Sequence, residues 1–274
     1  MPLSFARFLR PTVHAGWVAA SVLTLTLGLP AMAAPVMPTF ATAPAGWVTD
    51  RYDAVTFGNV GAYAGRNDVL GIGINSSTDL ANRSAGFQST FYNTQGRQTA
   101  ISGGAGSVLA ADLFIESGWE QASNGLVRTD MWGVMANAND TTLAYPIIGF
   151  TNFGGAARLR VFDADVGWVN LANVVAFGAW TALAIEFDGD SFDFFVNGAL
   201  VYSDMTISAA TTGFNAAIMQ AYNFADPALG TNTTTAYTAH WSNAVATAVP
   251  EPTSVALVAA AMAGVFAARR RKTA

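Results

Sequence analysis

Apolar and polar side chains alternate along residues 181–202, and this period of two constrains the fold more than any other feature of the chain. Leu183, Ile185 and Phe187 occupy every second position, and the same alternation resumes over 192–196. Successive side chains of a β-strand point to opposite faces of the sheet, whereas a helix would place apolar residues three or four positions apart. The segment therefore predicts strands with one apolar face.

Two turn sequences divide this segment into three parts. Asp-Gly-Asp stands at 188–190 and Asn-Gly stands at 197–198. Both suit the tight turns of β-hairpins, in which residues with a positive φ are required. We expect three consecutive antiparallel strands.

Similar short apolar runs recur between residues 47 and 248, separated by Gly, Asn, Asp and Ser, and no helical pattern longer than two turns occurs there. About a dozen short strands in roughly 200 residues predict an all-β fold, a two-sheet antiparallel jelly-roll sandwich. The runs are 69–74, 87–92, 108–115, 126–135, 147–151, 158–162, 216–222 and 237–243.

Hydrophobic residues make up 52% of the chain and charged residues only 11%, against roughly 25% charged in an average domain. Much of the apolar excess lies at the two ends. Near the N-terminus, Arg7 and Arg10 precede an apolar stretch at 15–29 that is too short to span a bilayer. Small residues follow, so we predict a signal peptide over 1–33, cleaved by signal peptidase between Ala33 and Ala34. The proline-rich residues 34–46 predict an extended tether.

The C-terminal end contains Val-Pro-Glu-Pro at 249–252, an apolar run at 253–268 and four cations at 269–272. The run predicts a short transmembrane helix, about 24 Å long, with its cations in the cytoplasm. This arrangement resembles the PEP-CTERM sorting signal of Gram-negative bacteria, which an exosortase processes in proteins that typically accompany exopolysaccharide. The resemblance implies recognition through Pro250, Glu251 and Pro252. It also implies a stop signal formed by Arg269, Arg270, Arg271 and Lys272.

The segment Trp180 to Tyr202 is similar to the hairpins of concanavalin A-like and laminin-G-like sandwiches, and a late strand at 236–244 fits the same pattern. The blocks at 91–97, 111–119 and 145–151 are similar to secreted bacterial proteins of this kind. The resemblance implies a jelly-roll domain over 47–248 and says little about activity.

Charge and composition exclude several functions. The chain contains no cysteine, which excludes a disulfide framework, thiol catalysis and cysteine-ligated metals. Without the two ends, seven arginines stand against 17 acidic residues, a net charge of −10 with no lysine. Such a domain repels nucleic acid and anionic lipid.

No credible catalytic set emerges from the sequence, so we predict a non-enzymatic protein. His240 is the only histidine of the exported part, and its alternating segment favours a packed or solvated ring. The closest match to the paired carboxylates of laminarinase-type glucanases is Glu186 with Asp188, but the second glutamate of that pattern is missing.

Two ligands are compatible with the remaining residues. Calcium would suit the hairpin carboxylates Asp188, Asp190 and Asp193, and a second acidic pair stands at Asp163 and Asp165. Each group is also consistent with ordinary turn chemistry, in which an Asp bonds to its own backbone. Trp168, placed by the sequence near a hairpin tip, is the candidate for a glycan contact.

These observations predict an exported, exosortase-sorted protein of the cell surface or extracellular matrix, associated with exopolysaccharide and non-enzymatic. The C-terminal helix would anchor it transiently in the inner membrane. The alternative is a lectin-like or glycan-hydrolysing jelly-roll protein.

Overall fold

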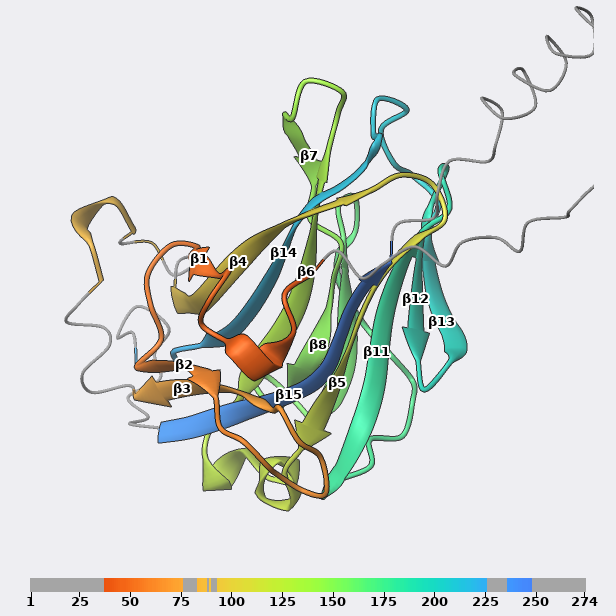
Figure 1. Ribbon diagram of the computed structural model, residues 1–274. Coiled ribbons are helices and arrows are strands. Elements are labelled where there is room, and N and C mark those ends of the chain that lie inside the picture. The colour runs from red at the N-terminus through yellow and green to blue at the C-terminus, as the bar shows by residue number, and fades with distance from the viewer. Residues whose placement is uncertain (1–36, 76–82, 88, 90–92, 226–235, 248–274) are drawn as a thin grey trace, which may run out of the picture. The chain divides into compact units, whose positions relative to one another are not determined.

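The computed structural model of the protein describes residues 37–75, 83–87, 89, 93–225 and 236–247 (Figure 1). These residues form fifteen β-strands and four short 3₁₀ turns, with no α-helix among them. The predicted all-β fold is therefore confirmed, and no helix of the described ranges has the length and apolarity needed to cross a bilayer. The predicted signal peptide, with Ala33 and Ala34, and the C-terminal helix lie outside these residues. The 3₁₀ turns are η1 (Phe40–Thr42), η3 (Ala85–Phe87), η5 (Ser117–Glu120) and η6 (Ala122–Asn124).

The strands form two antiparallel sheets. One sheet has seven strands in the order β13-β12-β11-β5-β15-β3-β2, and the other has eight, in the order β1-β4-β14-β6-β8-β9-β10 with β7 beside β6. The strands of the first sheet are β2 (Thr56–Asn59), β3 (Leu70–Asn75), β5 (Ser107–Ile115), β11 (Ala179–Phe187), β12 (Phe192–Val196), β13 (Ala199–Asp204) and β15 (Ala236–Thr247). Those of the second are β1 (Val48–Thr49), β4 (Thr94–Gly103), β6 (Arg128–Ala136), β7 (Thr142–Ala144), β8 (Ile147–Thr151), β9 (Arg158–Asp163), β10 (Gly167–Asn170) and β14 (Gly213–Tyr222).

The chain passes repeatedly from one sheet to the other. Strands β3, β5 and β15 are neighbours in the seven-stranded sheet, although β4, β6 and β14 of the other sheet are interleaved with them in sequence. Such crossing connections between two packed antiparallel sheets are typical of jelly rolls. Figure 1 shows the two sheets facing each other, with β15 and β5 in front of β14, β6 and β8.

The hairpins predicted from the period of two are present as β11, β12 and β13. Leu183 pairs with Val196 and Phe187 with Phe192, and all four side chains are buried. Asn197 and Gly198 both have positive φ, as the tight turn requires. The apolar face of this meander therefore packs inward, as predicted.

The interior lies between the two sheets. Strand β6 sends Met131 and Met135 into the main apolar cluster, while Trp132 and Val134 point out of the opposite face. Across the interior, the indole Nε1 of Trp241 donates a hydrogen bond to Thr129 Oγ1 at 3.0 Å. Both side chains are fully buried, so this bond joins the two sheets in a dry environment.

Part of the predicted tether belongs to the sandwich instead. The ring of Phe40 is only 2% exposed and packs 5.9 Å from that of Trp47. The amide of Asn59 donates to the carbonyl oxygen of Phe40 at 2.9 Å. Residues 37–46 therefore pack on the core. Burial of the Phe40 ring stabilises this packed arrangement by more than the conformational entropy that an extended linker would keep. The run predicted as a strand at 87–92 lies mostly outside the described residues, and its first residue ends η3.

Candidate functional site

The outer face of the eight-stranded sheet has a row of large apolar side chains that runs across the strands. Pairing places Trp132 beside Ile147, Ile147 beside Phe162, and Phe162 beside Trp168. These residues come from β6, β8, β9 and β10, and they share a face because they are in register. The row is a local surface feature, separate from the main core.

A hollow of about 410 Å³ lies over this row. Its volume falls in the range of small-ligand sites, roughly 300–1,000 Å³. Tyr145 is its most exposed ring at 37%, whereas Trp168 is half-buried and Trp132 is nearly inaccessible. The hollow is lined by Thr94, Arg128, Trp132, Tyr145, Ile147, Phe162, Trp168 and Tyr222. We call it the aromatic hollow.

A polar group lies beside the aromatic row on the same face. Asp130 is fully buried, and its Oδ2 accepts hydrogen bonds from Arg128 Nε at 2.6 Å and from Gln220 Nε2 at 2.8 Å. The neighbouring position across the ladder is Gly149, where an added Cβ would come within 2.4 Å of Asp130 Oδ1. The glycine therefore leaves room for the carboxylate.

Two arginines lie against the rings of the hollow. The guanidinium carbon of Arg160 is 3.6 Å from the centroid of the Trp168 ring. That of Arg128 is 4.8 Å from both Trp168 and Tyr222. Burial lowers the pKa of Arg160 to about 10, although the nearby Asp130 carboxylate opposes the shift, so the group is still positively charged at neutral pH.

The backbone beneath the hollow is held from the other sheet. The hydroxyl of Tyr237, on β15, lies 2.8 Å from the carbonyl oxygen of Arg128 and 2.7 Å from that of Tyr222. It also accepts the backbone N–H of Tyr222 at 3.0 Å. Burial raises the pKa of Tyr237, so the hydroxyl remains protonated. Sequence reasoning missed Tyr237, Arg128 and Arg160, because only the sheet pairing brings them together.

Trp168 lies within β10 and not at a hairpin tip. The exposed tip is formed by 164–166, and Trp168 reaches the sheet face instead, because its register opposite Phe162 places its ring 5.3 Å from that of Phe162. The predicted glycan contact thus lines the aromatic hollow.

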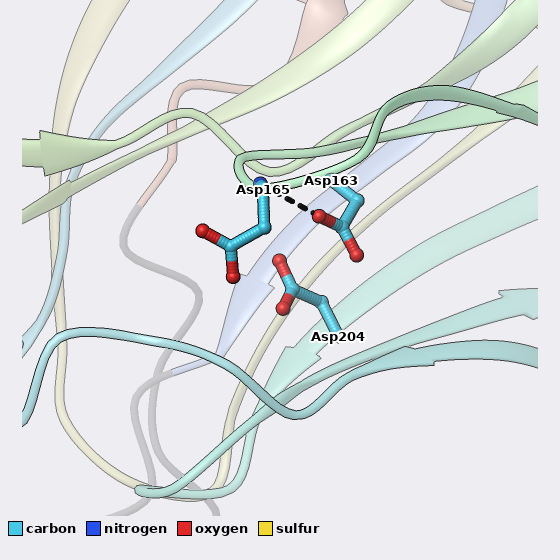
Figure 2. A group of neighbouring side chains, drawn as sticks. All are labelled: Asp163, Asp165 and Asp204. Carbon is cyan, nitrogen blue, oxygen red and sulfur yellow. Dashed lines mark hydrogen bonds between the residues drawn. The ribbon is translucent and has the colours of Figure 1, made fainter.

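The acidic residues near that hairpin form a compact group, shown in Figure 2. Carboxylate oxygens of Asp163, Asp165 and Asp204 lie within 4.8 Å of one another. Asp163 Oδ1 accepts the N–H groups of Asp165 and Val166, both at 2.8 Å, and its Oδ2 accepts the Tyr202 hydroxyl at 2.6 Å. Burial of Asp163 raises its pKa, but these hydrogen bonds outweigh that effect and the net pKa is lowered. Burial raises the pKa of Asp204.

The carboxylates of the hairpin predicted to hold calcium form no comparable group. Asp188 Oδ1 accepts the N–H groups of Asp190 and Ser191, and Asp193 accepts the hydroxyl of Ser203. Calcium at Asp188, Asp190 and Asp193 stays a prediction. A melting temperature unchanged by EGTA would contradict it.

His240 and Glu186 lie on the outer face of the seven-stranded sheet, away from the aromatic hollow. The His240 ring stacks on Tyr63 at 3.7 Å, and its Nδ1 is 3.3 Å from Glu116 Oε1. Burial lowers the pKa of His240, although Glu116 opposes the shift. Glu186 pairs in register with Asp193 of β12.

The chain is thus an all-β sandwich protein with an aromatic, arginine-bearing hollow on one face. Its residues 248–272 match the PEP-CTERM protein-sorting motif, so the chain carries this sorting signal, which supports exosortase-sorted export. The match includes Pro250, Glu251, Pro252 and the cations Arg269, Arg270, Arg271 and Lys272, all of which lie outside the structurally described residues.

Solved structures with a similar arrangement are distant in sequence. A carbohydrate-binding module of Bacillus subtilis is 13% identical over 74% of this chain and 96% of its own, with a TM-score of 0.37. A beta-glucanase of Bacillus licheniformis is 15% identical over 78% and 98%, with a TM-score of 0.46. An endo-beta-1,4-glucuronan lyase of the fungus Trichoderma reesei is 11% identical over 76% and 93%, with a TM-score of 0.49. Likeness at this level says nothing about what this chain binds. No curated protein matches it.

Proposed function

We propose that this protein is a non-enzymatic component of the cell surface or extracellular matrix that binds exopolysaccharide in the aromatic hollow. The C-terminal helix at 253–268 anchors the exported chain in the inner membrane until an exosortase processes it. The sorting motif supports export and processing by an exosortase. The proposed binding role rests on one observation, the hollow over Trp132, Phe162 and Trp168.

The chemistry of the hollow suits a saccharide. Sugar rings present apolar C–H faces and a rim of hydroxyl groups, which call for aromatic faces beside hydrogen-bonding groups. Tyr145 and Trp168 supply such rings, while Arg128 and Thr94 supply polar atoms at the same surface. Because the strands of a sheet hold these groups, little ordering is required when a ligand binds.

The carboxylates of the hollow favour binding over hydrolysis. Glycosidases use two carboxyl groups, roughly 5–10 Å apart, as acid and as nucleophile or base. Among the residues described here, Asp130 is the carboxylate next to the hollow, and it is buried against Arg128 and Gln220. Its Oδ2 already accepts two hydrogen bonds from these donors, so this oxygen is not free to attack a substrate.

A glycan array probed with the purified full-length protein in mild detergent tests this function. We expect binding to at least one extracellular polysaccharide, and Trp168→Ala should weaken it by roughly tenfold or more. Trp180→Ala is the matched control, because Trp180 also carries a stacked arginine, Arg66, but on the other sheet. Absence of binding to every glycan, or equal losses in both variants, would contradict the proposal.

The enzymatic alternative has its own test. Release of reducing ends from a β-glucan by the purified protein would overturn the non-enzymatic assignment. Loss of that activity in Glu186→Gln would assign it to the carboxylate predicted from the sequence.

A further inference from the structure

We propose that the aromatic hollow selects glycans that carry carboxylate groups, uronate polymers in chemical terms, with Arg128 binding the sugar carboxylate and the positive charge of Arg160, beside Trp168, adding to the attraction. This inference rests on the proposed function and specifies its ligand. The two can fail separately, because a neutral glycan would satisfy the function and not the inference.

Positive charge is concentrated at this hollow in a protein that is otherwise acidic. Outside the two terminal signals the chain has seven arginines, no lysine and a net charge of −10. Three of those arginines lie over rings of the hollow, since Arg51 is 5.0 Å from the Trp132 ring and Arg128 and Arg160 lie against Trp168. Asp50 pairs with Arg51. The carboxylate of Asp130 pairs with Arg128 and also lies near Arg160, so three cations stand against two carboxylates and one positive charge is in excess.

Arg128 presents the outer part of its guanidinium to the hollow. Its Nε donates a hydrogen bond to Asp130, and the flanking rings of Trp168 and Tyr222 restrict the orientation of the guanidinium. Within the described part of the chain, its two Nη atoms make no hydrogen bond, and they are not fully buried. A guanidinium held in this way offers two parallel N–H donors, which match the two oxygens of a carboxylate.

Arg160 is the stronger indication of an anionic ligand. The residue is only 8% exposed. Among the described residues, neither its Nε nor its Nη2 has a hydrogen-bond partner. A buried cation without a hydrogen-bond acceptor is costly, and an anion bound to Arg128 would lower this cost by adding negative charge near Arg160.

A neutral glycan would leave this arrangement unexplained. Its hydroxyl groups accept weaker hydrogen bonds and do not compensate the charge of Arg160. The net negative charge of the domain disfavours anionic polymers in general, so the hollow would also determine where such a polymer binds.

The test compares uronate hexamers with their own carboxyl-reduced forms. Hexamers of mannuronate, guluronate, galacturonate and glucuronate are titrated into the full-length protein by calorimetry, with EDTA present to exclude calcium bridging. Each reduced hexamer has the same linkages but carries a hydroxymethyl group where the uronate has its carboxylate. We expect at least one uronate to bind roughly tenfold or more tightly than its reduced form, with a preference that falls as NaCl is added.

Two variants assign the preference to Arg128. Arg128→Lys keeps a cation beside Asp130 and should reduce the preference severalfold, since an ammonium lacks the paired donors. Arg128→Gln should abolish it. Arg66→Gln is the control, because Arg66 likewise stacks on a tryptophan and pairs with an aspartate, Asp112, on the other sheet.

The outcomes separate the two proposals. Equal binding of a uronate and its reduced form, lost in Trp168→Ala, overturns the inference and leaves the function standing. A preference that survives in Arg128→Lys and Arg128→Gln also overturns it. Binding to sulfated dextran but to no uronate overturns the inference, because the hollow would then recognise sulfate groups and not carboxylates. No binding to any hexamer or glycan overturns both proposals.

Discussion

The phenolic oxygen of Tyr237 lies 2.8 Å from the carbonyl oxygen of Arg128, on the opposite sheet of the sandwich. The same hydroxyl accepts the backbone N–H of Tyr222 at 3.0 Å. One group of the seven-stranded sheet thus fixes two backbone segments whose side chains line the aromatic hollow. The position of the hollow is therefore coupled to the packing between the sheets.

Tyr237→Phe should destabilise the protein and weaken glycan binding together. Removal of the hydroxyl leaves a buried N–H and carbonyl groups without this partner, at a cost of about 1–3 kcal/mol in unfolding free energy. Urea denaturation measures the first effect and calorimetric titration with a bound glycan the second. A loss of stability with unchanged affinity would show that Tyr237 does not position the hollow.

Gly149→Ala should distort the polar group beside the hollow. An added Cβ would lie 2.3 Å from the carbonyl oxygen of Thr129 and 2.4 Å from Asp130 Oδ1, so the strands must shift. We expect a loss of about 1–3 kcal/mol in unfolding free energy, measured in urea. Gly118→Ala is the control, because nothing lies within 4 Å of its added Cβ. Equal stability of the two variants would contradict the packing described here.

Thr129→Val tests the bond that joins the sheets. Thr129 Oγ1 accepts the indole N–H of Trp241 and donates to the carbonyl oxygen of Gln220 at 2.8 Å. Valine keeps the shape but leaves the buried N–H without an acceptor, at a cost of about 1–3 kcal/mol. Thermal unfolding should detect this loss, whereas Thr142→Val, at an exposed position of β7, should leave the midpoint nearly unchanged.

Phe40→Ala distinguishes a packed segment from a tether. Because the ring is buried, its removal should cost about 3–5 kcal/mol in unfolding free energy. Val174→Ala, at a side chain that is 95% exposed, is the control. A Phe40→Ala variant as stable as the parent in urea would restore the original interpretation of residues 37–46 as a linker.

The stabilisation provided by Asp188 should depend on pH. The N–H of Asp190 is the main cause that lowers the pKa of Asp188, and bonds from Ser191 add to it. A lowered pKa means that the carboxylate stabilises the folded state above the unfolded value, about 3.9, and that this contribution is lost as pH falls through the folded value.

The melting temperature of Asp188→Ala should therefore lie below that of the parent at pH 7, and the two should converge on acidification. Asp190→Ala is the control, since the Asp190 side chain makes no bond in this turn. A difference that is constant between pH 7 and pH 3 would refute the assignment.

Much of the fold could be predicted because it is encoded locally. The alternation at Leu183, Ile185 and Phe187 and the turn at Asn197 and Gly198 determine which faces are buried and where the chain reverses. Strand β4 was missed because its polar side chains bond to the segment before β2, as Gln95 does to the carbonyl oxygen of Asp53. Its sequence therefore lacks the apolar alternation by which the other strands were recognised.

The site was predictable only in part. Trp168 was identified as an aromatic residue outside the expected core, but one of its partners, Arg128, comes from β6, a strand that is distant in sequence. Arg128 and Arg160 are 32 positions apart in the sequence. They meet at Trp168 because a single strand, β8, lies between β6 and β9 in the sheet. Asp204 joins Asp163 in the same way, from the edge strand of the other sheet.

The hydrogen bonds of Asp163 bear on the affinity of a site that this residue does not touch. Asp163 ends β9, which carries Arg160, and its oxygens hold the turn into β10, which carries Trp168. The Tyr202 hydroxyl fastens that turn to the other sheet. One wall of the hollow is thus rigid before any ligand arrives, so binding there loses little conformational entropy, and loosening this turn would lower affinity without removing a single ligand contact.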